Sequence, residues 1–482
     1  MKSVFSEKHY RDFLKPRRDL WEEVYSSQTD HKRWSRYYHK RLESVFAFLV
    51  PPGQKVLELG CGEGDLLNSV RPSFGVGIDF SQNAINKAKK KHHNLSFVVA
   101  NVERLPVKGT FDYIIVSDIL NDLWDIEKLF RACRKLCSRD TRIIINCYSR
   151  LWQIPLMIAR KFGLAQPLMN QNWVTSEDVQ NLLYLSEFET IRTWSEVLCP
   201  LEMNKASHFL NSFLVRMPFF NQGALTNFVI ARPHFSSEIS SCEKPSVSIL
   251  IPARNEAGNI REILERTPNL GSSTEIIFVE GNSTDETYST IEKEISNFPG
   301  RKILLFKQTG KGKGDAVRLG FSKASGDILM ILDADMTVAP EDLPRFYEAL
   351  VSGKGDFING IRLVYPMENN AMRFFNLIGN KFFSMAFSAI LGQNIKDTLC
   401  GTKVLWRKDY EKISSNRSFF GDFDPFGDFD LLFGAAKLNL KIIDMPIRYK
   451  ERKYGETNIE RWKHGWMLLQ MVIFAARKLK FR

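Results

Sequence analysis

The sequence predicts an α/β protein made of two doubly wound domains, each a mostly parallel sheet with helices on both faces. Its 482 residues are more than one ordinary domain holds. In both halves, short apolar runs alternate with helix-length stretches, which is the pattern of βαβ units. Between the halves, residues 232–246 (RPHFSSEISSCEKPS) are rich in Ser and Pro and lack apolar periodicity, as expected of a linker.

The apolar runs give the expected strands. In the first half they are residues 55–59, 74–79, 96–100, 113–117, 142–147, 188–197 and 224–231. In the second half they are residues 247–252, 275–280, 302–306 and 327–332. Ligands of doubly wound sheets bind beyond the carboxyl ends of the strands, so we expect one nucleotide-like site in each half.

The composition is that of a globular protein with enough apolar material for two cores, at 44% hydrophobic and 25% charged residues. The seven cysteines show no CxxC spacing, so neither a disulfide framework nor a zinc site is expected, and a cytoplasmic location is predicted. The first twenty residues are too charged for a signal peptide. No apolar run approaches the ~18 residues of a transmembrane helix.

Two stretches combine apolar and basic residues, namely 374–392 and 462–481. From residue 441 to 482 there are eleven Lys or Arg and four Asp or Glu, so +7 of the net charge of +12 lies there. Each stretch is either a helix on the surface of a membrane or a helix docked on its own domain. The first interpretation predicts peripheral binding at the inner face of the membrane.

A glycine-rich turn follows the first expected strand, in the segment Val56–Gly64 (VLELGCGEG). Glycines there allow a ligand to approach the backbone closely. Asp79 ends the next strand, about 20 residues after the loop, where an acid can hold both hydroxyls of a ribose. Glu58 would repel a pyrophosphate, whereas a cationic ligand such as S-adenosylmethionine suits it. A domain that binds a dinucleotide, or has lost its ligand, is the alternative.

Glu58-x-Gly60-x-Gly62-x-Gly64, Asp79 and the segment Ala100–Val107 (ANVERLPV) resemble the motifs of class I S-adenosylmethionine-dependent methyltransferases. The resemblance covers residues 35–232, after a helical extension at residues 1–34, and includes the two late strands that close the sheet of that family. It implies that the loop holds the methionine part and Asp79 the ribose. The implied cofactor-binding residues are Glu58, Gly60, Cys61, Gly62, Gly64, Asp79, Asn101, Val102 and Ser117.

Two details of this half stay open. The family commonly has an acid where Asn101 stands, and the Asn carbonyl can still accept a hydrogen bond from adenine, with Glu103 nearby. Methyl transfer to a hydroxyl needs a general base. The candidate bases, none of which stands in a diagnostic motif, are Asp118, Asp122, His31 and His39.

In the second half, the segment Gly326–Thr337 (GDILMILDADMT) places Asp333 and Asp335 directly after an apolar strand. Side chains two apart on a strand point the same way, so the two carboxylates repel each other unless a cation lies between them. Oxygen ligands suit Mg²⁺ or Mn²⁺, which would also bind phosphate oxygens. The alternative is that Asp335 only caps the next helix.

Four segments at successive strand ends resemble family 2 glycosyltransferases of the GT-A fold, over residues 246–460. They are IPARNEAGNI (251–260), VEGNSTDET (279–287), GKGKGDAVRL (310–319) and LDADMTVAPEDL (332–343). The resemblance implies a nucleotide-diphospho-sugar donor. The implied donor-binding residues are Pro252, Arg254, Asn255, Glu256, Glu280, Lys311, Lys313, Asp333, Ala334 and Asp335, the last also the metal ligand together with Asp333. Glu280-Gly281 departs from the two adjacent Asp that the family often carries there.

The end of this region is the expected acceptor part. Asp428 or Asp430 is the candidate catalytic carboxylate, with capping of the following helix as the structural alternative. Arg452, Tyr454 and Thr457 match a phosphate-binding segment of polyprenyl-phosphate hexosyltransferases, although Asn458 stands where that family has a lysine.

The sequence therefore predicts a bifunctional enzyme that transfers a methyl group and a hexose, the latter to a polyprenyl phosphate or a glycan intermediate. Two alternatives stay open. The first half is a non-catalytic scaffold for a glycosyltransferase, or the basic chain is an RNA methyltransferase with a silent second domain. Against the second, no RNA-binding module is evident and no nucleic-acid partner is expected. The sequence does not set an oligomeric state. It also leaves open which sugar is transferred.

Overall fold

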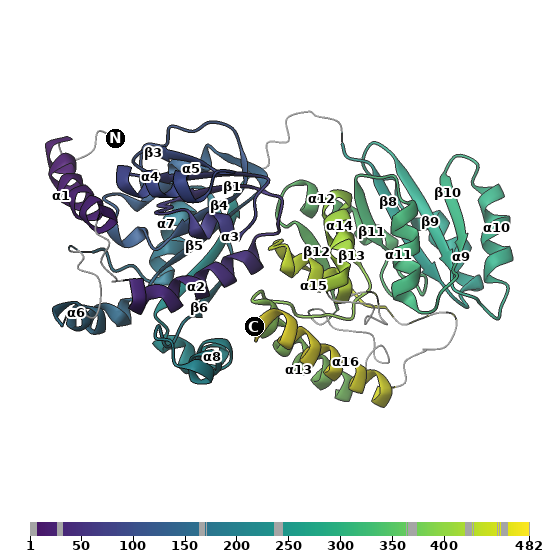
Figure 1. Ribbon diagram of the computed structural model, residues 1–482. Coiled ribbons are helices and arrows are strands. Elements are labelled where there is room, and N and C mark those ends of the chain that lie inside the picture. Colours follow the sequence, from purple (N-terminus) through teal and green to yellow (C-terminus); the bar gives the residue numbers. More distant parts are fainter. Residues whose placement is uncertain are drawn as a thin grey trace. The chain divides into compact units, whose positions relative to one another are not determined.

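The computed structural model describes residues 7–26, 32–162, 169, 171–235, 244–362, 364, 374–419, 427, 429–450, 452, 454 and 461–481. The chain divides into two compact units, residues 1–235 with 481–482 and residues 236–480. Each unit contains a seven-stranded sheet (Figure 1). The predicted class, two α/β domains in sequence order, is confirmed.

The sheet of the first unit has the strand order β3-β2-β1-β4-β5-β7-β6. Its strands are β1 (Lys55–Leu59), β2 (Phe74–Asp79), β3 (Ser96–Val99), β4 (Phe111–Ser117), β5 (Cys137–Tyr148), β6 (Phe188–Glu196) and β7 (Thr226–Pro233). The first five are parallel, whereas β7 runs antiparallel to both β5 and β6. All seven predicted strands exist, and β5 is longer than expected because it begins at Cys137.

Two cores sandwich this sheet, because successive side chains of a buried strand point to opposite faces. Leu57 and Ile114 belong to one core, and Val56 and Ile115 belong to the other. The helices are α1 (Glu7–Ser26), α2 (Lys32–Leu49), α3 (Asp65–Ser69), α4 (Gln82–Lys91), α5 (Ile126–Arg134), α6 (Gln153–Lys161), α7 (Ser176–Leu185) and α8 (Asn204–Ser212).

The sheet of the second unit has the order β10-β9-β8-β11-β13-β12-β14. Its strands are β8 (Val247–Ala253), β9 (Thr274–Glu280), β10 (Lys302–Lys307), β11 (Ile328–Ile331), β12 (Phe357–Ile361), β13 (Lys403–Trp406) and β14 (Ile442–Pro446). Strand β13 is antiparallel to its neighbours β11 and β12. The four predicted strands are present, and β12, β13 and β14 were not predicted.

Helices cover both faces of the second sheet as well, with Leu250 and Leu329 in one core and Ile249 and Met330 in the other. The helices are α9 (Ile260–Arg266), α10 (Thr287–Asn297), α11 (Lys313–Lys323), α12 (Leu343–Val351), α13 (Phe374–Leu391), α14 (Arg407–Ser415), α15 (Phe429–Lys437) and α16 (Arg461–Ala475). A π-helical turn at Ala476–Lys480 extends α16.

The two amphipathic stretches form α13 and α16, which run side by side (Figure 1). Phe387 of α13 lies 5.0 Å from Phe429 of α15 between ring centroids, and Leu468 of α16 is buried in the same core. Both helices therefore dock on their own unit through one face. Their other faces still expose apolar side chains, with Met385 67% and Trp466 62% exposed. Within the described ranges, no helix has both the length and the apolar character needed to cross a membrane.

Candidate active sites

A cavity of 2510 Å³ opens in the first unit beyond the carboxyl ends of β1, β2 and β4. Typical small-molecule sites measure about 300–1,000 Å³, so this one has room for a nucleoside-sized ligand and a second reactant. Eight of the nine predicted cofactor residues line it. The ninth, Gly64, caps the start of α3 with a left-handed backbone (φ 81°).

The glycine-rich turn needs glycine for both conformation and space. Gly60 and Gly62 have positive φ values, 74° and 50°. A Cβ at Gly60 would overlap the side chain of Ile119, and one at Gly62 would lie 2.6 Å from the hydroxyl of Tyr25. The turn is therefore closely covered, and Tyr25 of α1 forms part of the cover.

Two buried acids lie at this turn. Glu58 is 2% exposed, burial raises its pKa well above the ordinary value, and its Oε2 has no hydrogen-bond partner within the described residues. Asp79 accepts hydrogen bonds from the backbone N–H groups of Gly62 (3.0 Å) and Ser81 (2.9 Å). A buried carboxylate oxygen without a partner is costly unless a donor or a cation meets it. These residues therefore fit a ligand with an ammonium group, as S-adenosylmethionine has.

Both polar groups of the Asn101 side chain form hydrogen bonds within the protein. Its carbonyl oxygen accepts from the backbone N–H of Glu103 at 2.8 Å, and its amide donates to the hydroxyl of Tyr10 at 2.8 Å. One lone pair of the carbonyl remains for an adenine amine. Glu103 itself accepts from the backbone N–H of Trp124 at 2.8 Å, so one of its oxygens stabilises a loop.

Helix α1 closes over the cavity, a role that the sequence did not indicate. The carboxylate of Glu22 accepts hydrogen bonds from the backbone N–H groups of Gln82 (2.7 Å) and Asn83 (3.0 Å) and from the hydroxyl of Ser81 (3.0 Å). Glu22 thereby ties α1 to the first turn of α4. The sequence did not indicate this contact, because a glutamate in a highly charged helix is usually expected to face solvent.

The candidate bases fall in different places. Asp118 and Asp122 both line the cavity, as does His39. Burial raises the pKa of both aspartates, to about 7 for Asp118. His31 lies outside the described residues.

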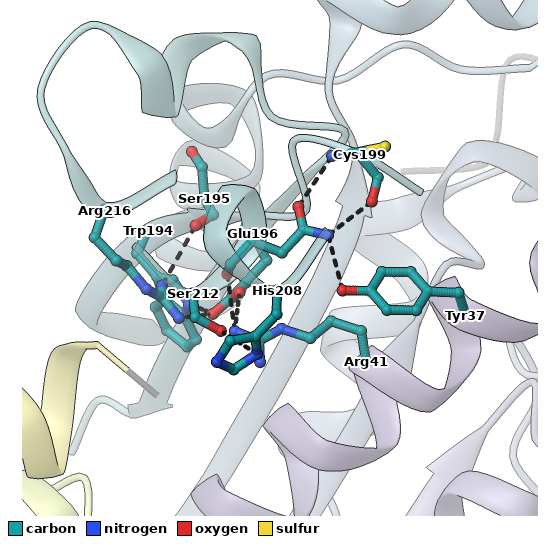
Figure 2. Close-up of polar contacts among 10 residues, drawn as sticks. Tyr37, Arg41, Trp194, Ser195, Glu196, Cys199, His208, Ser212 and Arg216 are labelled. Carbon is teal, nitrogen blue, oxygen red and sulfur yellow. Dashed lines mark hydrogen bonds and ion pairs between the residues drawn. The ribbon is translucent and has the colours of Figure 1, made fainter. Parts of the chain in front are cut away.

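A second polar cluster surrounds Glu196 (Figure 2). Glu196 of β6 is almost fully buried and forms ion pairs with Arg216 and, at 3.3 Å, Arg41 of α2, and it accepts from the indole N–H of Trp194 at 3.0 Å. The amide of Asn211 donates to the backbone carbonyl of Cys199 at 2.7 Å. Every charge drawn here is paired, so we assign the cluster to holding the segment after β6 against α2.

In the second unit, the loops after β8 and β9 are tied together. The side-chain carbonyl of Asn255 accepts from the backbone N–H of Thr284 at 2.8 Å, and Ser283 donates its backbone N–H to Glu280 at 2.5 Å. Asn255 has a positive φ of 58°, a conformation that Asn tolerates better than most residues. Pro252 precedes this loop and Arg254 is exposed in it. The predicted donor-binding residue Asn255 thus joins the loop after β8 to the loop after β9.

Lys313, the first residue of α11, reaches Asp333 with 2.6 Å between Nζ and Oδ1. Burial raises the pKa of Asp333, but the ammonium group of Lys313 outweighs burial and holds that pKa below its ordinary value. Lys311, on the same glycine-rich loop, is exposed. Of the two lysines among the predicted donor-binding residues, Lys313 is therefore the one that contacts Asp333.

Asp335 accepts from the hydroxyl (2.7 Å) and the backbone N–H (3.1 Å) of Thr337, with buried Ala334 between the two aspartates. Burial and the neighbouring Asp333 raise the pKa of Asp335. The following helical segments have Ala339 and Asp342 at their N-caps, so Asp335 makes a local turn and does not cap a helix.

The two aspartates fit a magnesium or manganese ion as part of a larger set. No group of three or more His, Cys, Asp or Glu side chains able to hold a metal occurs among the residues that the structure describes. Mg²⁺ in transferases is commonly bound through one or two carboxylates plus substrate phosphates and water. Asp333 and Asp335 could supply the protein part of that set.

Arg452 and Tyr454, from the predicted acceptor segment, lie close to residues of the predicted donor site. The guanidinium group of Arg452 forms an ion pair with Glu256 and lies 4.0 Å from Oδ2 of Asp335. A Cβ at Gly258 would lie 2.5 Å from the ring of Tyr454, so that ring packs against the loop after β8. Thr457 and Asp428 lie outside the described residues.

Asp430 is the second residue of α15 and is buried. Its Oδ2 accepts a hydrogen bond from Nε of Arg417 at 2.8 Å. Gly427 packs against the residue that follows Lys313, because a Cβ at Gly427 would lie 2.5 Å from Cα of Gly314. The sequence did not indicate Arg417 or Gly401, because Arg417 meets Asp430 and Gly401 meets Asp333 only in the folded chain.

Comparison with known proteins agrees with the motifs. Residues 51–190 match the family model of a methyltransferase domain, and residues 248–414 match glycosyl transferase family 2. A dolichol-phosphate mannosyltransferase of Pyrococcus furiosus is 29% identical over 219 residues, which cover 44% of this chain and 59% of that protein. An undecaprenyl-phosphate 4-deoxy-4-formamido-L-arabinose transferase of Edwardsiella ictaluri is 26% identical over 228 residues, covering 46% and 64%. The chain thus spans less than two thirds of either relative.

Solved structures give weaker likenesses. Magnesium protoporphyrin IX methyltransferase of Synechocystis aligns with a TM-score of 0.32 and 18% identity, covering 45% of this chain and 93% of that one. Glucosyl-3-phosphoglycerate synthase of Mycobacterium tuberculosis aligns with a TM-score of 0.36 and 18% identity, covering 49% and 81%. Scores this low say nothing about function.

The protein has two α/β units, and in each unit polar residues gather beyond the carboxyl ends of parallel strands, where ligands of doubly wound sheets bind. One part of the chain matches a methyltransferase-domain model and a later part matches a glycosyl transferase family 2 model, in the order that the motifs predicted.

Proposed function

We propose that this chain is a two-activity transferase. Its second domain transfers a hexose from a nucleotide-diphospho-sugar to a polyprenyl phosphate with the help of a divalent cation. Its first domain transfers a methyl group from S-adenosylmethionine. The fusion suggests that both activities serve one glycolipid or glycan.

One observation carries the glycosyl transfer: Arg452 of the acceptor segment lies against Glu256 and beside Asp335 of the donor segment. An arginine beside the donor diphosphate is well placed to hold a phosphate acceptor, because guanidinium and phosphate match in charge and geometry. A phosphate oxygen then attacks the anomeric carbon, the bond from that carbon to the nucleoside diphosphate breaks, and the nucleoside diphosphate leaves.

A phosphate nucleophile would explain why Asp430 is paired with an arginine. A hydroxyl acceptor would need a base to take its proton, whereas an ionised phosphate attacks without losing one. Asp430 is instead bound to Arg417. We therefore favour a positioning role for Asp430 over proton transfer.

The cation belongs at Asp333 and Asp335. When bound there, Mg²⁺ or Mn²⁺ neutralises the charge that develops on the leaving diphosphate. Lys313, already paired with Asp333, adds a second positive charge at the same place.

Two features support a lipid acceptor. The relatives named above are transferases named for dolichol phosphate and undecaprenyl phosphate. In addition, α13 and α16 expose Phe382, Met385 and Trp466 on helices that also carry exposed Lys381 and Arg477. Aromatic and basic side chains together favour the interface of an anionic membrane.

The methyl transfer rests on the cavity of the first domain and on the unpartnered Oε2 of Glu58 at its glycine-rich turn. Glu58 would bind the ammonium group of the cofactor and Asp79 would bind its ribose. The glycines would let the cofactor lie close to the backbone of the turn. If this domain is only a scaffold, it will not bind S-adenosylhomocysteine.

Thermal stabilisation tests both halves, because a ligand that binds the native state raises the melting point. A panel of nucleotide-sugars is added with and without Mn²⁺ to the wild type and to Asp335→Asn, with S-adenosylhomocysteine in parallel. We expect one donor to stabilise the protein only with Mn²⁺, and Asp335→Asn to lose this shift while keeping that of S-adenosylhomocysteine. A metal-independent shift in both proteins would contradict the assignment of Asp335.

A further inference from the structure

Asp118 directly follows β4, and its backbone and carboxylate are held in a defined conformation. Its backbone has a positive φ of 56°, which is unfavourable for a residue other than glycine and is a feature that clusters at functional sites. Its carboxylate is held at two points. The hydroxyl of Tyr38 from α2 donates to Oδ2 at 2.9 Å, and the amide of Asn146 from β5 donates to Oδ1 at 2.6 Å.

These partners orient the carboxylate without neutralising it, because neither carries a positive charge. Oδ1 also lies 3.0 Å from the Tyr38 hydroxyl and so has two donors, whereas Oδ2 has one, and its second lone pair can accept a hydrogen bond from a ligand. Asp118 lines the cavity and follows Ser117, one of the implied cofactor residues. It is therefore accessible to a second reactant that lies beside the cofactor.

The ionisation of Asp118 suits proton transfer near neutral pH. Burial raises its pKa to about 7, although Tyr38 and Asn146 act in the opposite direction. The titratable groups that face it are Tyr38 on α2, and Cys147 and Tyr148 on β5, whose pKa values burial and then Asp118 raise. These groups stay neutral at this pH, so Asp118 supplies the negative charge of this corner.

The wall next to Asp118 is aromatic and apolar. The rings of Tyr38 and Tyr148 stack with 6.1 Å between centroids, and Trp152 and Leu156 at the start of α6 continue the lining. On its outer side α6 exposes further apolar side chains, including Ile154 at 63% and Met157 at 59%. An apolar path therefore leads from the surface of α6 toward the carboxylate.

We infer that Asp118 is the general base of an O-methyl transfer whose acceptor is a neutral hydroxyl compound with an apolar portion, such as a sugar hydroxyl of a glycolipid. This inference rests on the proposed methyltransferase activity. The hydroxyl oxygen attacks the methyl carbon, the bond between that carbon and the sulfur of S-adenosylmethionine breaks, and S-adenosylhomocysteine leaves. The hydroxyl proton passes to Asp118, which releases it to water after the product departs.

Three matched probes test this acceptor class with the full chain and labelled S-adenosylmethionine. Octyl β-glucoside offers neutral hydroxyls on an apolar chain, octanoate offers a nucleophile without a proton to remove, and octylamine offers an amine. We expect methylation of octyl β-glucoside and a rate that rises with pH through one ionisation near neutrality. Asp118→Asn should lower this rate by about 10²–10⁴-fold, the usual contribution of a general base.

Two controls separate a base from a structural residue. Asp118→Asn should keep its stabilisation by S-adenosylhomocysteine, and Tyr38→Phe, which removes only an orienting hydrogen bond, should keep the pH dependence at a reduced rate. An active Asp118→Asn, or methylation of octanoate or octylamine in place of the glucoside, would overturn the inference. So would binding of S-adenosylhomocysteine without methylation of any probe. If S-adenosylhomocysteine does not bind the wild type, the proposed methyltransferase activity itself fails.

Discussion

Lys313 and Asp333 meet at 2.6 Å in the space that Gly401 leaves free. A Cβ at position 401 would overlap both the carboxylate of Asp333 and the ammonium group of Lys313. The ion pair joins the start of α11 to the segment after β11, and Gly401 lies just before β13. Three elements of the second unit therefore hold the Lys313–Asp333 ion pair in place. This arrangement is where the donor diphosphate is expected.

Gly401→Ala should therefore disable donor binding without unfolding the first domain. Displacing the ion pair costs about 1–3 kcal/mol of packing energy, enough to weaken a ligand by about tenfold or more. The measurement is the stabilisation by the nucleotide-sugar with Mn²⁺. Gly300→Ala is the matched control, because nothing lies within 4 Å of a Cβ there. Equal donor binding by both variants would contradict this role of Gly401.

Arg452→Lys should reduce transfer to polyprenyl phosphate far more than donor binding. A lysine keeps the charge but loses the planar fork that holds a phosphate in two places. We expect the KM for undecaprenyl phosphate to rise about tenfold or more while the donor still stabilises the protein. Lys450→Met removes a nearby exposed charge and should leave the KM unchanged. A similar rise in Lys450→Met would indicate general charge attraction.

Glu58→Gln should lose cofactor binding and yet raise the melting point of the ligand-free protein. The pKa of Glu58 is raised in the folded state, so ionisation of this buried acid destabilises the fold as pH increases above its unfolded pKa. The gain in melting point should therefore be small near pH 4 and grow toward pH 8. Differential scanning calorimetry at several pH values checks the trend, and a gain that falls with rising pH would refute it.

Glu22→Gln should loosen α1 and weaken S-adenosylhomocysteine binding. The hydrogen bonds from Gln82, Asn83 and Ser81 outweigh burial and lower the pKa of Glu22. A lowered carboxyl pKa gives stability that is present above the unfolded pKa and is lost as pH falls. The protection of residues 7–26 against hydrogen exchange, relative to the intrinsic rate at each pH, should thus fall in this variant at neutral pH and in the wild type at acid pH. Asp19→Asn, an exposed change on the same helix, should leave exchange unaltered.

Trp466→Ser should reduce binding to vesicles that contain anionic lipid. Trp466 is 62% exposed on α16 and would enter the membrane interface. Co-sedimentation with such vesicles measures the loss. Tyr184→Ser removes an aromatic side chain that is 77% exposed in the first domain and should bind as the wild type does. Unchanged binding of Trp466→Ser would show that this face of α16 does not touch lipid.

Among the predicted strands, several carry a run of three or more apolar residues, such as residues 275–280 (EIIFVE) and 302–306 (KILLF). The sequence did not predict Phe357–Ile361, where Asn359 and Gly360 interrupt the apolar pattern, or the four-residue strand Lys403–Trp406. Such short strands are specified by neighbouring strands more than by their own composition. Together with Ile442–Pro446, which was also missed, they are the three strands of the second sheet that follow the Asp pair in the chain.

Residues of the two sites differ in the same way. Glycines and acids at strand ends, such as Gly60, Asp79 and Asp333, were visible because local spacing defines them. Tyr38 and Gly401 were not, because their roles depend on contacts 80 and 68 residues away in the chain, with Asp118 and Asp333 respectively. Only the fold brings such groups together.

Transfer of a labelled hexose to undecaprenyl phosphate in vesicles tests the account most directly. Each candidate nucleotide-sugar is incubated with the full chain and Mn²⁺, and the lipid is extracted. We predict that one donor gives labelled polyprenyl-phosphate sugar and that Asp335→Asn abolishes this product. Gly401→Ala is assayed in parallel, and excess lipid should restore the product in neither variant. Hexose transfer to a water-soluble acceptor while the lipid stays unlabelled would contradict the proposed acceptor.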